Sequence, residues 1–245
     1  MTTRTKSTTR TKPKKPAKGP TAEEVRILKE VQSLFSVLAV APTPLTVPGG
    51  KGGRYELYTY FFVAERLKRE SRDLQVINPA PGLTFLFKGR PSHASNDYSY
   101  CTFTNMAGEY FDLRNGVEYQ GHNMKHEVDI AVSTPLDHKQ VPTEKELRFA
   151  VECKYFAEQN GFKGQFRSQV GAIMDLTREH HAGTGCLLCG TRFQAYFASH
   201  HPFSTHKEFT QYLLSYHITP LFDFHPRGKS LPMARRWVHD CYIGL

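Results

Sequence analysis

The 245-residue chain lacks several features that would place it in a specialised class of protein. It has no run near the roughly eighteen consecutive apolar residues of a membrane span and no N-terminal apolar segment typical of a secretory signal. Cysteine is scarce, and its five residues are odd in number and irregularly spaced, which argues against a disulfide framework and for a reducing compartment. Hydrophobic residues make up 39% of the chain, enough for a packed core. We therefore expect a globular protein of the cytoplasm, or of the nucleus in a eukaryote, with no membrane partner.

Acidic residues are absent from the first twenty positions, which carry seven basic side chains. The chain has 32 basic and 23 acidic residues, so the part after residue 20 has 25 basic residues against 23 acidic ones and is nearly neutral. The segment also has no large apolar side chain to bury, so we predict that residues 1–20 form a disordered basic tail. Two functions stay open for it: a solubilising extension, or an arm that contacts nucleic-acid phosphates without sequence preference.

Two helices are predicted after the tail. Residues 21–24 read Thr-Ala-Glu-Glu, a capping box, and apolar residues follow at helical spacing until a proline ends the pattern. A glycine-rich hinge at 49–53 then leads to a second helix, expected over 55–69. We divide the chain accordingly into an N-terminal helix with its linker (21–48) and a main domain (49–245).

The middle of the chain is rich in aromatic and β-branched runs that are separated by Gly, Pro and Asn, a pattern that predicts strands. These strands are expected at 74–77, 83–87, 98–103, 108–113, 116–120, 126–133 and 147–155. A helix over 165–179 and a short buried strand over 185–190 should follow, then a helix near 206–216 and a strand near 218–224. This order predicts an α/β (α+β) fold with one central mixed β-sheet flanked by helices.

One predicted strand carries charges that an apolar strand rarely holds. In the segment 149–156, Phe-Ala-Val-Glu-Cys-Lys-Tyr-Phe, alternation places Glu152 and Lys154 on one face and Cys153 on the other. Buried charges are costly unless they are paired or bind a cation. The same acid-x-lysine spacing recurs at 137–139, but there it stands in a polar stretch, which we interpret as an exposed loop.

A second acidic strand is expected beside the first. Asp129 stands between Val128 and Ile130, and the polar connection to the following strand favours pairing of the two strands as neighbours. The carboxylates of Asp129 and Glu152 could then converge on one divalent cation. Oxygen ligands favour Mg²⁺ or Mn²⁺, which keep bound waters and so can present a nucleophile.

Taken in chain order, these residues resemble the PD-(D/E)xK nuclease superfamily. The resemblance rests on Glu56 in a helix, Asp129 in a hairpin strand and Glu152-Cys153-Lys154 in the next strand, and it covers about residues 54–200. It implies a restriction-endonuclease-like core. In that core the helix predicted after Lys154 is the following helix, and the strand predicted over 185–190 is the last core strand.

The resemblance also implies a function: a Mg²⁺- or Mn²⁺-dependent nuclease acting on nucleic acid, with DNA favoured, in restriction, defence, repair or recombination. Asp129, Glu152 and the backbone carbonyl of Cys153 would hold the metal. Lys154 would orient the attacking water or stabilise the transition state, and Glu56 would bind a second metal or position it through water. The expected nucleic-acid contacts are Gln165, Arg167 and Gln169. A homodimer is left open.

Two departures from the family pattern leave alternative site residues open. Valine rather than proline precedes Asp129, and the gap from Asp129 to Glu152 is long, so Asp112 is the reserve aspartate. Glu65 is the rival of Glu56 as the helix acid. The alternative functions are a catalytically inactive nucleic-acid-binding protein with the same fold, and a different α/β hydrolase or small-molecule enzyme in which the Glu-x-Lys spacing is incidental.

Overall fold

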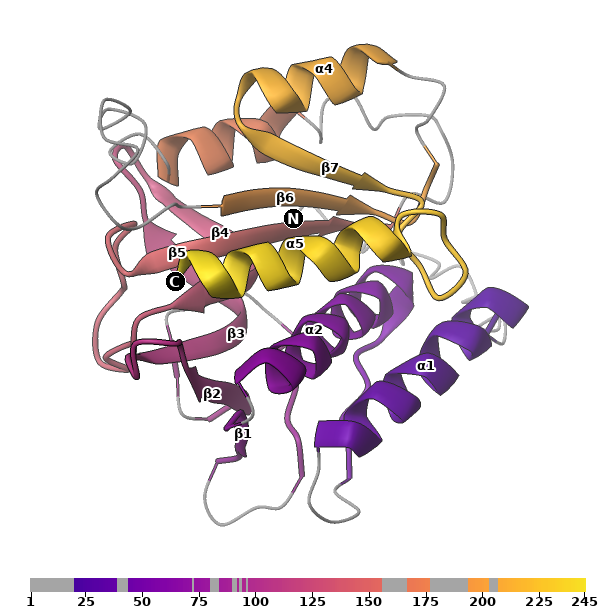
Figure 1. The fold of residues 1–245 in the computed structure, drawn as a ribbon, viewed down its shortest axis with the longest axis horizontal. Coiled ribbons are helices and arrows are strands. Elements are labelled where there is room, and N and C mark those ends of the chain that lie inside the picture. The colour runs from indigo at the N-terminus through magenta and orange to yellow at the C-terminus, as the bar shows by residue number, and fades with distance from the viewer. Residues whose placement is uncertain are drawn as a thin grey trace, which may run out of the picture.

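The computed structural model describes residues 20–38, 44–71, 73–79, 84–89, 92, 94–95, 97–155, 167–176, 194–202 and 207–245. Its centre is a seven-stranded mixed sheet in which strands that neighbour one another in space also follow one another in sequence (Figure 1). The strands are β1 (Gln75–Ile77), β2 (Tyr100–Thr104), β3 (Tyr110–Gln120), β4 (Lys125–Ser133), β5 (Leu147–Lys154), β6 (Gln194–Ser199) and β7 (Ile218–Phe222). Strands β1 to β5 pair antiparallel, whereas β5, β6 and β7 pair parallel. The expected α/β class with one mixed sheet is confirmed.

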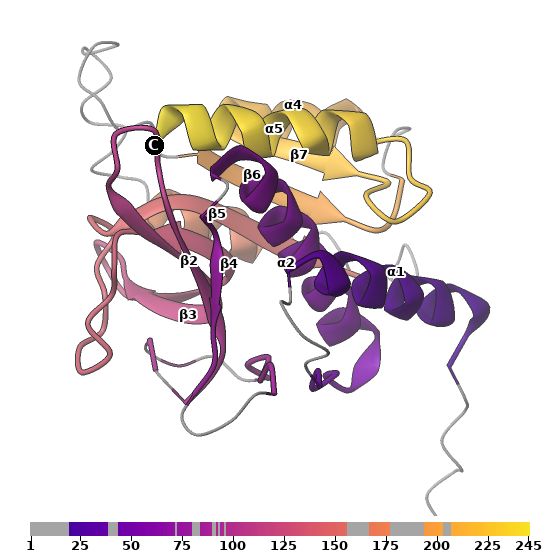
Figure 2. The same ribbon diagram turned by 60° about the horizontal axis from the view of Figure 1, so that its bottom comes forward.

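Helices cover both faces of this sheet. They are α1 (Ala22–Leu38), α2 (Gly50–Ser71), α4 (Lys207–Ser215) and α5 (Leu231–Gly244), and residues 167–176 are also helical. Helices α1, α2 and α5 share the main hydrophobic core with one face of the sheet, and Figures 1 and 2 show α1 lying outside α2. The 167–176 helix and α4 pack with β6 and β7 in a separate cluster. None of the described helices is long and apolar enough to cross a bilayer.

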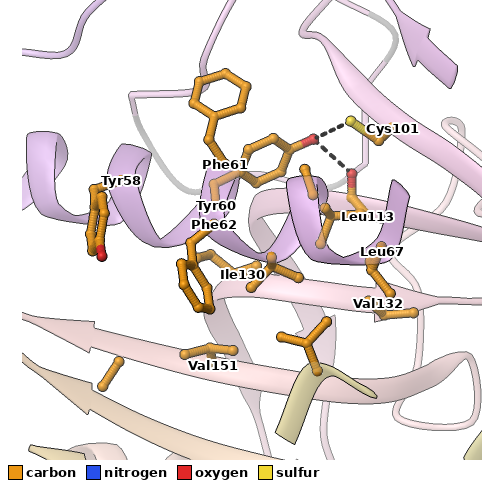
Figure 3. Packing of buried hydrophobic residues seen from close by; sticks show 14 of the residues in the cluster. Tyr58, Tyr60, Phe61, Phe62, Leu67, Cys101, Leu113, Ile130, Val132 and Val151 are labelled. Atoms are coloured by element: carbon orange, nitrogen blue, oxygen red, sulfur yellow. Dashed lines mark hydrogen bonds between the residues drawn. The ribbon is translucent and has the colours of Figure 1, made fainter. Parts of the chain in front are cut away.

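Helix α2 forms the centre of the main core because nearly all of its residues from Tyr55 to Leu67 are buried, and most of these are aromatic or aliphatic. Figure 3 shows it lying over Ile130, Val132 and Val151 of the sheet. The Tyr60 hydroxyl, which is fully buried, donates a hydrogen bond to the Leu113 carbonyl at 3.0 Å. This bond satisfies a polar group that would be costly to bury alone, and it ties α2 to β3.

Helix α1 begins as the capping box predicts. The Thr21 hydroxyl accepts the Glu24 N–H at 3.3 Å, and the Glu24 carboxylate accepts the Thr21 N–H at 2.7 Å. The apolar residues of α1 that recur every three or four positions, Ile27, Val31, Phe35 and Leu38, are buried in the core that α2 occupies.

Three element boundaries differ from the sequence predictions. Helix α2 begins at Gly50 and not at residue 55, because the glycines form its first turn, where Gly53 approaches Pro48 too closely for a larger side chain. One strand, β3, replaces the two predicted over 108–120, because pairing with β4 continues on both sides of Gly116. Of the strand predicted over 83–87, the described residues 84–87 form no strand, and Phe85 forms a single bridge to Leu45.

In the C-terminal part of the fold, α4 and β7 confirm the helix expected near 206–216 and the strand expected near 218–224. The expected last core strand, 185–190, lies outside the described residues, and the strand that pairs parallel with β5 is β6. Helix α5 was not predicted, although it has a proline in its first turn and buries Ala234, Trp237, Val238 and Cys241 at helical spacing.

Candidate active site

Strand β4 changes the face that it presents to the core at Asp129. Ile130 belongs to the main core under α2, whereas Val128 belongs to a second cluster that includes Leu176 of the 167–176 helix. Strict alternation would keep Val128 and Ile130 on one face. Gly116 of β3 and Asp129 of β4 stand between the register pairs Asn115–Ile130 and Val117–Val128, and Gly116 has a φ of 58°, a left-handed conformation that glycine adopts without steric cost. Gly116 thus permits the local rotation of the strands around Asp129.

The Asp129 carboxylate lies where the regular pairing of β4 with β5 ends. The last pair on this side of the ladder is Ile130 with Val151. Beyond it, Asp129 Oδ2 accepts the backbone N–H of Cys153 at 2.7 Å. The Asp129 carboxylate therefore accepts a hydrogen bond from the buried Cys153 N–H, which lies beyond the last backbone pair of the two strands.

Lys154 joins the two acidic strands. Its Nζ lies 3.0 Å from Asp129 Oδ2 and 3.4 Å from Glu152 Oε2, and the Glu152 residue is 1% exposed. Burial works against the charge of Lys154, but the two carboxylates outweigh it and raise the pKa of the ammonium above its ordinary value. Burial, followed by the charge of Asp129, also raises the pKa of Glu152. Cys153 lies in the main core, so the predicted separation of faces along β5 holds.

Glu56, and not Glu65, is the acid of α2 whose pKa is influenced by the charges of Asp129 and Lys154. Burial, followed by the negative charge of Asp129, raises the pKa of Glu56 to about 7. Glu65 is also buried, but its carboxylate pairs with Arg66 at 3.4 Å and with Arg69. These contacts assign Glu65 to a separate ion-pair cluster on α2.

The reserve aspartate, Asp112, is part of a structural pair elsewhere in the sheet. It lies 3.0 Å from Arg114 and is in register with Ser133 of β4, not with Asp129. The Arg114 guanidinium in turn stacks on the Tyr100 ring, 3.5 Å from its centroid. The group around Lys154 therefore contains Asp129 and not the reserve aspartate, Asp112.

Two charged residues beside the site were not anticipated. Burial, followed by the charge of Asp129, raises the pKa of Glu127, and burial lowers the pKa of Lys88 to about 8. Glu127 Oε1 and the Lys88 stem each lie 3.6 Å from the position that a Cβ on Gly116 would take, so both pack against this glycine. Glu127 stands two residues before Asp129 and could have been suspected. Lys88 lies in an irregular segment that gives no such signal.

The nucleic-acid contacts expected from the sequence remain predictions. Gln165 lies outside the described residues, Gln169 is half-buried and Arg167 is exposed on the 167–176 helix. The other acid-x-lysine sequence, 137–139, lies in an exposed turn, as its polar context indicates.

The carboxylate oxygens of this site are ligands of the kind that a small divalent cation prefers. Within the described residues, no three Asp, Glu, His or Cys side chains are grouped closely enough to enclose a metal ion. Mg²⁺ needs fewer than three side-chain ligands, because it usually keeps several waters and binds one or two carboxylates. Four carboxylates share this region with two lysines: Glu56, Glu127, Asp129 and Glu152 with Lys88 and Lys154. Burial is the main cause of the raised pKa values of Glu56, Glu127 and Glu152, and the negative charge of Asp129 adds to each shift. A cation would offset this charge.

Comparisons of the chain with family models, with curated proteins and with solved structures found no match. The observations that bear on function are therefore the contacts of this site. They are an ammonium between two buried carboxylates, an acid of α2 with a raised pKa, and a surplus of carboxylates where β4 and β5 separate.

Proposed function

We propose that this protein is a Mg²⁺- or Mn²⁺-dependent nuclease that cleaves nucleic acid, with DNA favoured, as its resemblance to the PD-(D/E)xK superfamily implies. The observation that carries the proposal is the position of Lys154, whose Nζ lies 3.0 Å from Asp129 and 3.4 Å from Glu152 on neighbouring strands. A fold by itself does not define a reaction, so the proposal depends on these side chains and not on the sheet.

Asp129 and Glu152, with the backbone carbonyl of Cys153, are the groups that would hold the cation. A bound divalent metal lowers the pKa of a coordinated water and offsets negative charge on the reacting phosphoryl group. Glu56, whose pKa of about 7 lets it exchange a proton near neutral pH, would position that water or a second cation.

Lys154 has a separate role in this proposal. Its raised pKa keeps the ammonium charged, and a protonated amine has no lone pair to give a metal. It would therefore donate hydrogen bonds to the attacking water or to the phosphoryl oxygens, where negative charge increases in the transition state. A cation bound by the two carboxylates would compete for the ion pairs of Lys154 and so free the ammonium for this task.

One observation favours the second candidate, a nucleic-acid-binding protein without catalysis. Asp129, Glu152 and Lys154 satisfy one another without any metal, so the same contacts could serve only to hold β4 and β5 together. This candidate predicts binding of nucleic acid with no dependence on a divalent cation and no turnover.

A cleavage assay distinguishes the two candidates. Plasmid, linear and single-stranded DNA and RNA would be incubated with the full chain in Mg²⁺, in Mn²⁺ or in EDTA. Glu152→Gln is the test variant, and Asp137→Asn is the matched control because Asp137 has the same acid-x-lysine spacing in an exposed turn. Metal-dependent cleavage that is lost only in Glu152→Gln supports the nuclease. Binding without cleavage by the unmodified protein rejects it.

A further inference from the structure

The parallel strands β5, β6 and β7 end in one row. The register aligns Lys154, Ser199 and Phe222 across these strands. Figures 1 and 2 show β6 and β7 ending beside the loop that leads to α5. This row and the residues that follow it form the carboxyl end of the sheet, and Lys154 of the candidate active site is part of it. In open α/β sheets, ligands bind outside the carboxyl ends of the parallel strands.

The loop after β7 is held in place by its own contacts. Asp223 accepts the Lys229 N–H at 3.0 Å and pairs with His225 at 2.9 Å. The Gly228 N–H donates to the His225 carbonyl at 2.8 Å. A Cβ on Gly228 would lie 1.7 Å from the Asp223 carbonyl oxygen, so only glycine fits at this position. The side chains of the loop therefore project from a well-defined backbone.

Two side chains of this loop are exposed cations. Arg227 and Lys229 are exposed, and neither side chain forms an ion pair within the described part of the chain. A third cation, Lys51 in the first turn of α2, lies 5.6 Å from the ring centroid of Tyr155, the residue that follows β5. Cations thus lie beside the ends of both β5 and β7.

Acidic residues at the carboxyl end of the sheet contact other residues of the protein. Glu23 of α1 pairs with His200 and accepts a hydrogen bond from the Tyr155 hydroxyl at 3.0 Å. Glu24 pairs with Arg54 at 2.9 Å. In the candidate active site, by contrast, four carboxylates share the region with two lysines, and this excess repels phosphate until a divalent cation binds. Nucleic acid therefore needs cations beside the site to hold it there.

The basic N-terminal segment joins the fold at this same end. Helix α1 begins at Ala22, and its next residue, Glu23, makes the contacts with β5 and β6 given above. All seven basic side chains of the segment lie within the first eighteen positions. The nearest, Lys18, is five residues before Glu23, a distance of at most about 18 Å along an extended chain. The sequence left the role of this segment open, and its point of attachment is beside the cations of the loop.

We propose that duplex DNA lies across the carboxyl end of β5, β6 and β7, where Lys51, Arg227 and Lys229 contact its phosphates and the N-terminal segment extends these contacts. The choice of DNA rests on the proposed nuclease function. β5 and β7 are two strand spacings apart, about 10 Å, which corresponds to about three phosphates of one DNA strand at 3.4 Å each. Contacts to phosphates position a duplex without reading its bases. The surface therefore binds DNA without sequence preference and holds one phosphate at Lys154.

Two lysines at opposite ends of the sheet provide a matched test. Lys229 follows β7, whereas Lys139 is exposed in the turn that precedes β5. Binding of a fluorescein-labelled DNA duplex to the full chain would be measured by fluorescence anisotropy across a salt series, in EDTA. We expect Lys229→Gln and Arg227→Gln each to reduce the slope of log K against log salt by about 0.9, the effect of one lost phosphate contact. Lys139→Gln should leave the slope unchanged.

The opposite results would overturn the proposal. These are no binding of the duplex to the unmodified chain, an unchanged slope in both Lys229→Gln and Arg227→Gln, or an equal fall of the slope in Lys139→Gln. The test needs neither a metal nor turnover, so it is separate from the test of the nuclease. A protein that does not cleave DNA but shows the expected difference between Lys229→Gln and Lys139→Gln would refute the nuclease and support this surface.

Discussion

Replacing Lys154 by methionine tests whether one ammonium makes the buried carboxylates of β4 and β5 tolerable. Lys154 Nζ lies 3.0 Å from Asp129 and 3.4 Å from Glu152, and the Glu152 side chain is 2% exposed. Methionine preserves most of the apolar stem but removes the charge. Asp129 keeps its hydrogen bond from Cys153, whereas Glu152 loses the ammonium with which it pairs.

The expected cost follows from the burial of this group. Removing one partner of a buried ion pair typically costs about 3–5 kcal/mol. Two features reduce that cost: the Lys154 side chain is 20% exposed, and the raised pKa of Glu152 allows it to take up a proton. We therefore expect the free energy of unfolding to fall by about 2–3 kcal/mol at neutral pH. The loss should shrink as the pH falls, because Glu152 becomes neutral in the folded variant before it does so in the unfolded chain.

Urea unfolding in EDTA would measure this loss, with Lys139→Met as the control because Lys139 is exposed in the 137–139 turn. Adding Mg²⁺ should raise the unfolding midpoint of Lys154→Met more than that of the unmodified protein, because a cation that binds the folded state replaces the missing charge. The same variant should lose cleavage activity while it still binds Mn²⁺. An unfolding midpoint in EDTA equal to that of the unmodified protein would refute the reasoning, as would an equal gain from Mg²⁺.

Three more predictions concern other parts of the chain. Glu152→Gln should abolish metal-dependent cleavage and leave the stability in EDTA unchanged or slightly higher, because it removes one of two repelling carboxylates. Asp175→Asn should lower the free energy of unfolding by about 2 kcal/mol, since Asp175 accepts hydrogen bonds from Asn123 and Met124 at 3.0–3.2 Å and pairs with His126 at 2.9 Å. Burial opposes the shift, but these bonds lower the pKa of Asp175, so the difference should disappear as the pH falls through that pKa. Deletion of residues 1–20 should leave the melting temperature unchanged. Where the tail binds nucleic acid, the deletion should also reduce the slope of log K against log salt by about 0.7–0.9 for each phosphate that the tail neutralises.

Each of these predictions has a result that contradicts it. Full activity of folded Glu152→Gln would show that the acid only holds the strands together. An unchanged urea midpoint for Asp175→Asn at neutral pH would mean that its hydrogen bonds do not stabilise the turn between β3 and β4. Superimposable salt curves, measured by fluorescence anisotropy of labelled DNA, would show that residues 1–20 do not bind phosphate.

Features that depend only on local geometry could be predicted from the sequence. The capping box at Thr21 requires only residues within one helical turn, and it forms as predicted. Glu152 and Lys154 lie on the same face of β5, as the two-residue period of a strand predicts. The polar neighbours of residues 137–139 were enough to predict an exposed turn there. The α/β class likewise follows from the order of such local patterns.

Which acidic residues lie together depends on the packing of whole elements and could not be predicted from local patterns. Glu56 and Glu65 are nine residues apart on one helix, about two and a half turns, so they point to opposite sides and the packing of α2 selects Glu56. Asp129 and Asp112 both lie in strands, and the register of β3, β4 and β5 selects Asp129. The position of Lys88 beside Gly116 likewise depends on a contact between segments far apart in the chain. The positions of these residues depend on how whole elements pack, and the spacing of residues along one element does not contain that information.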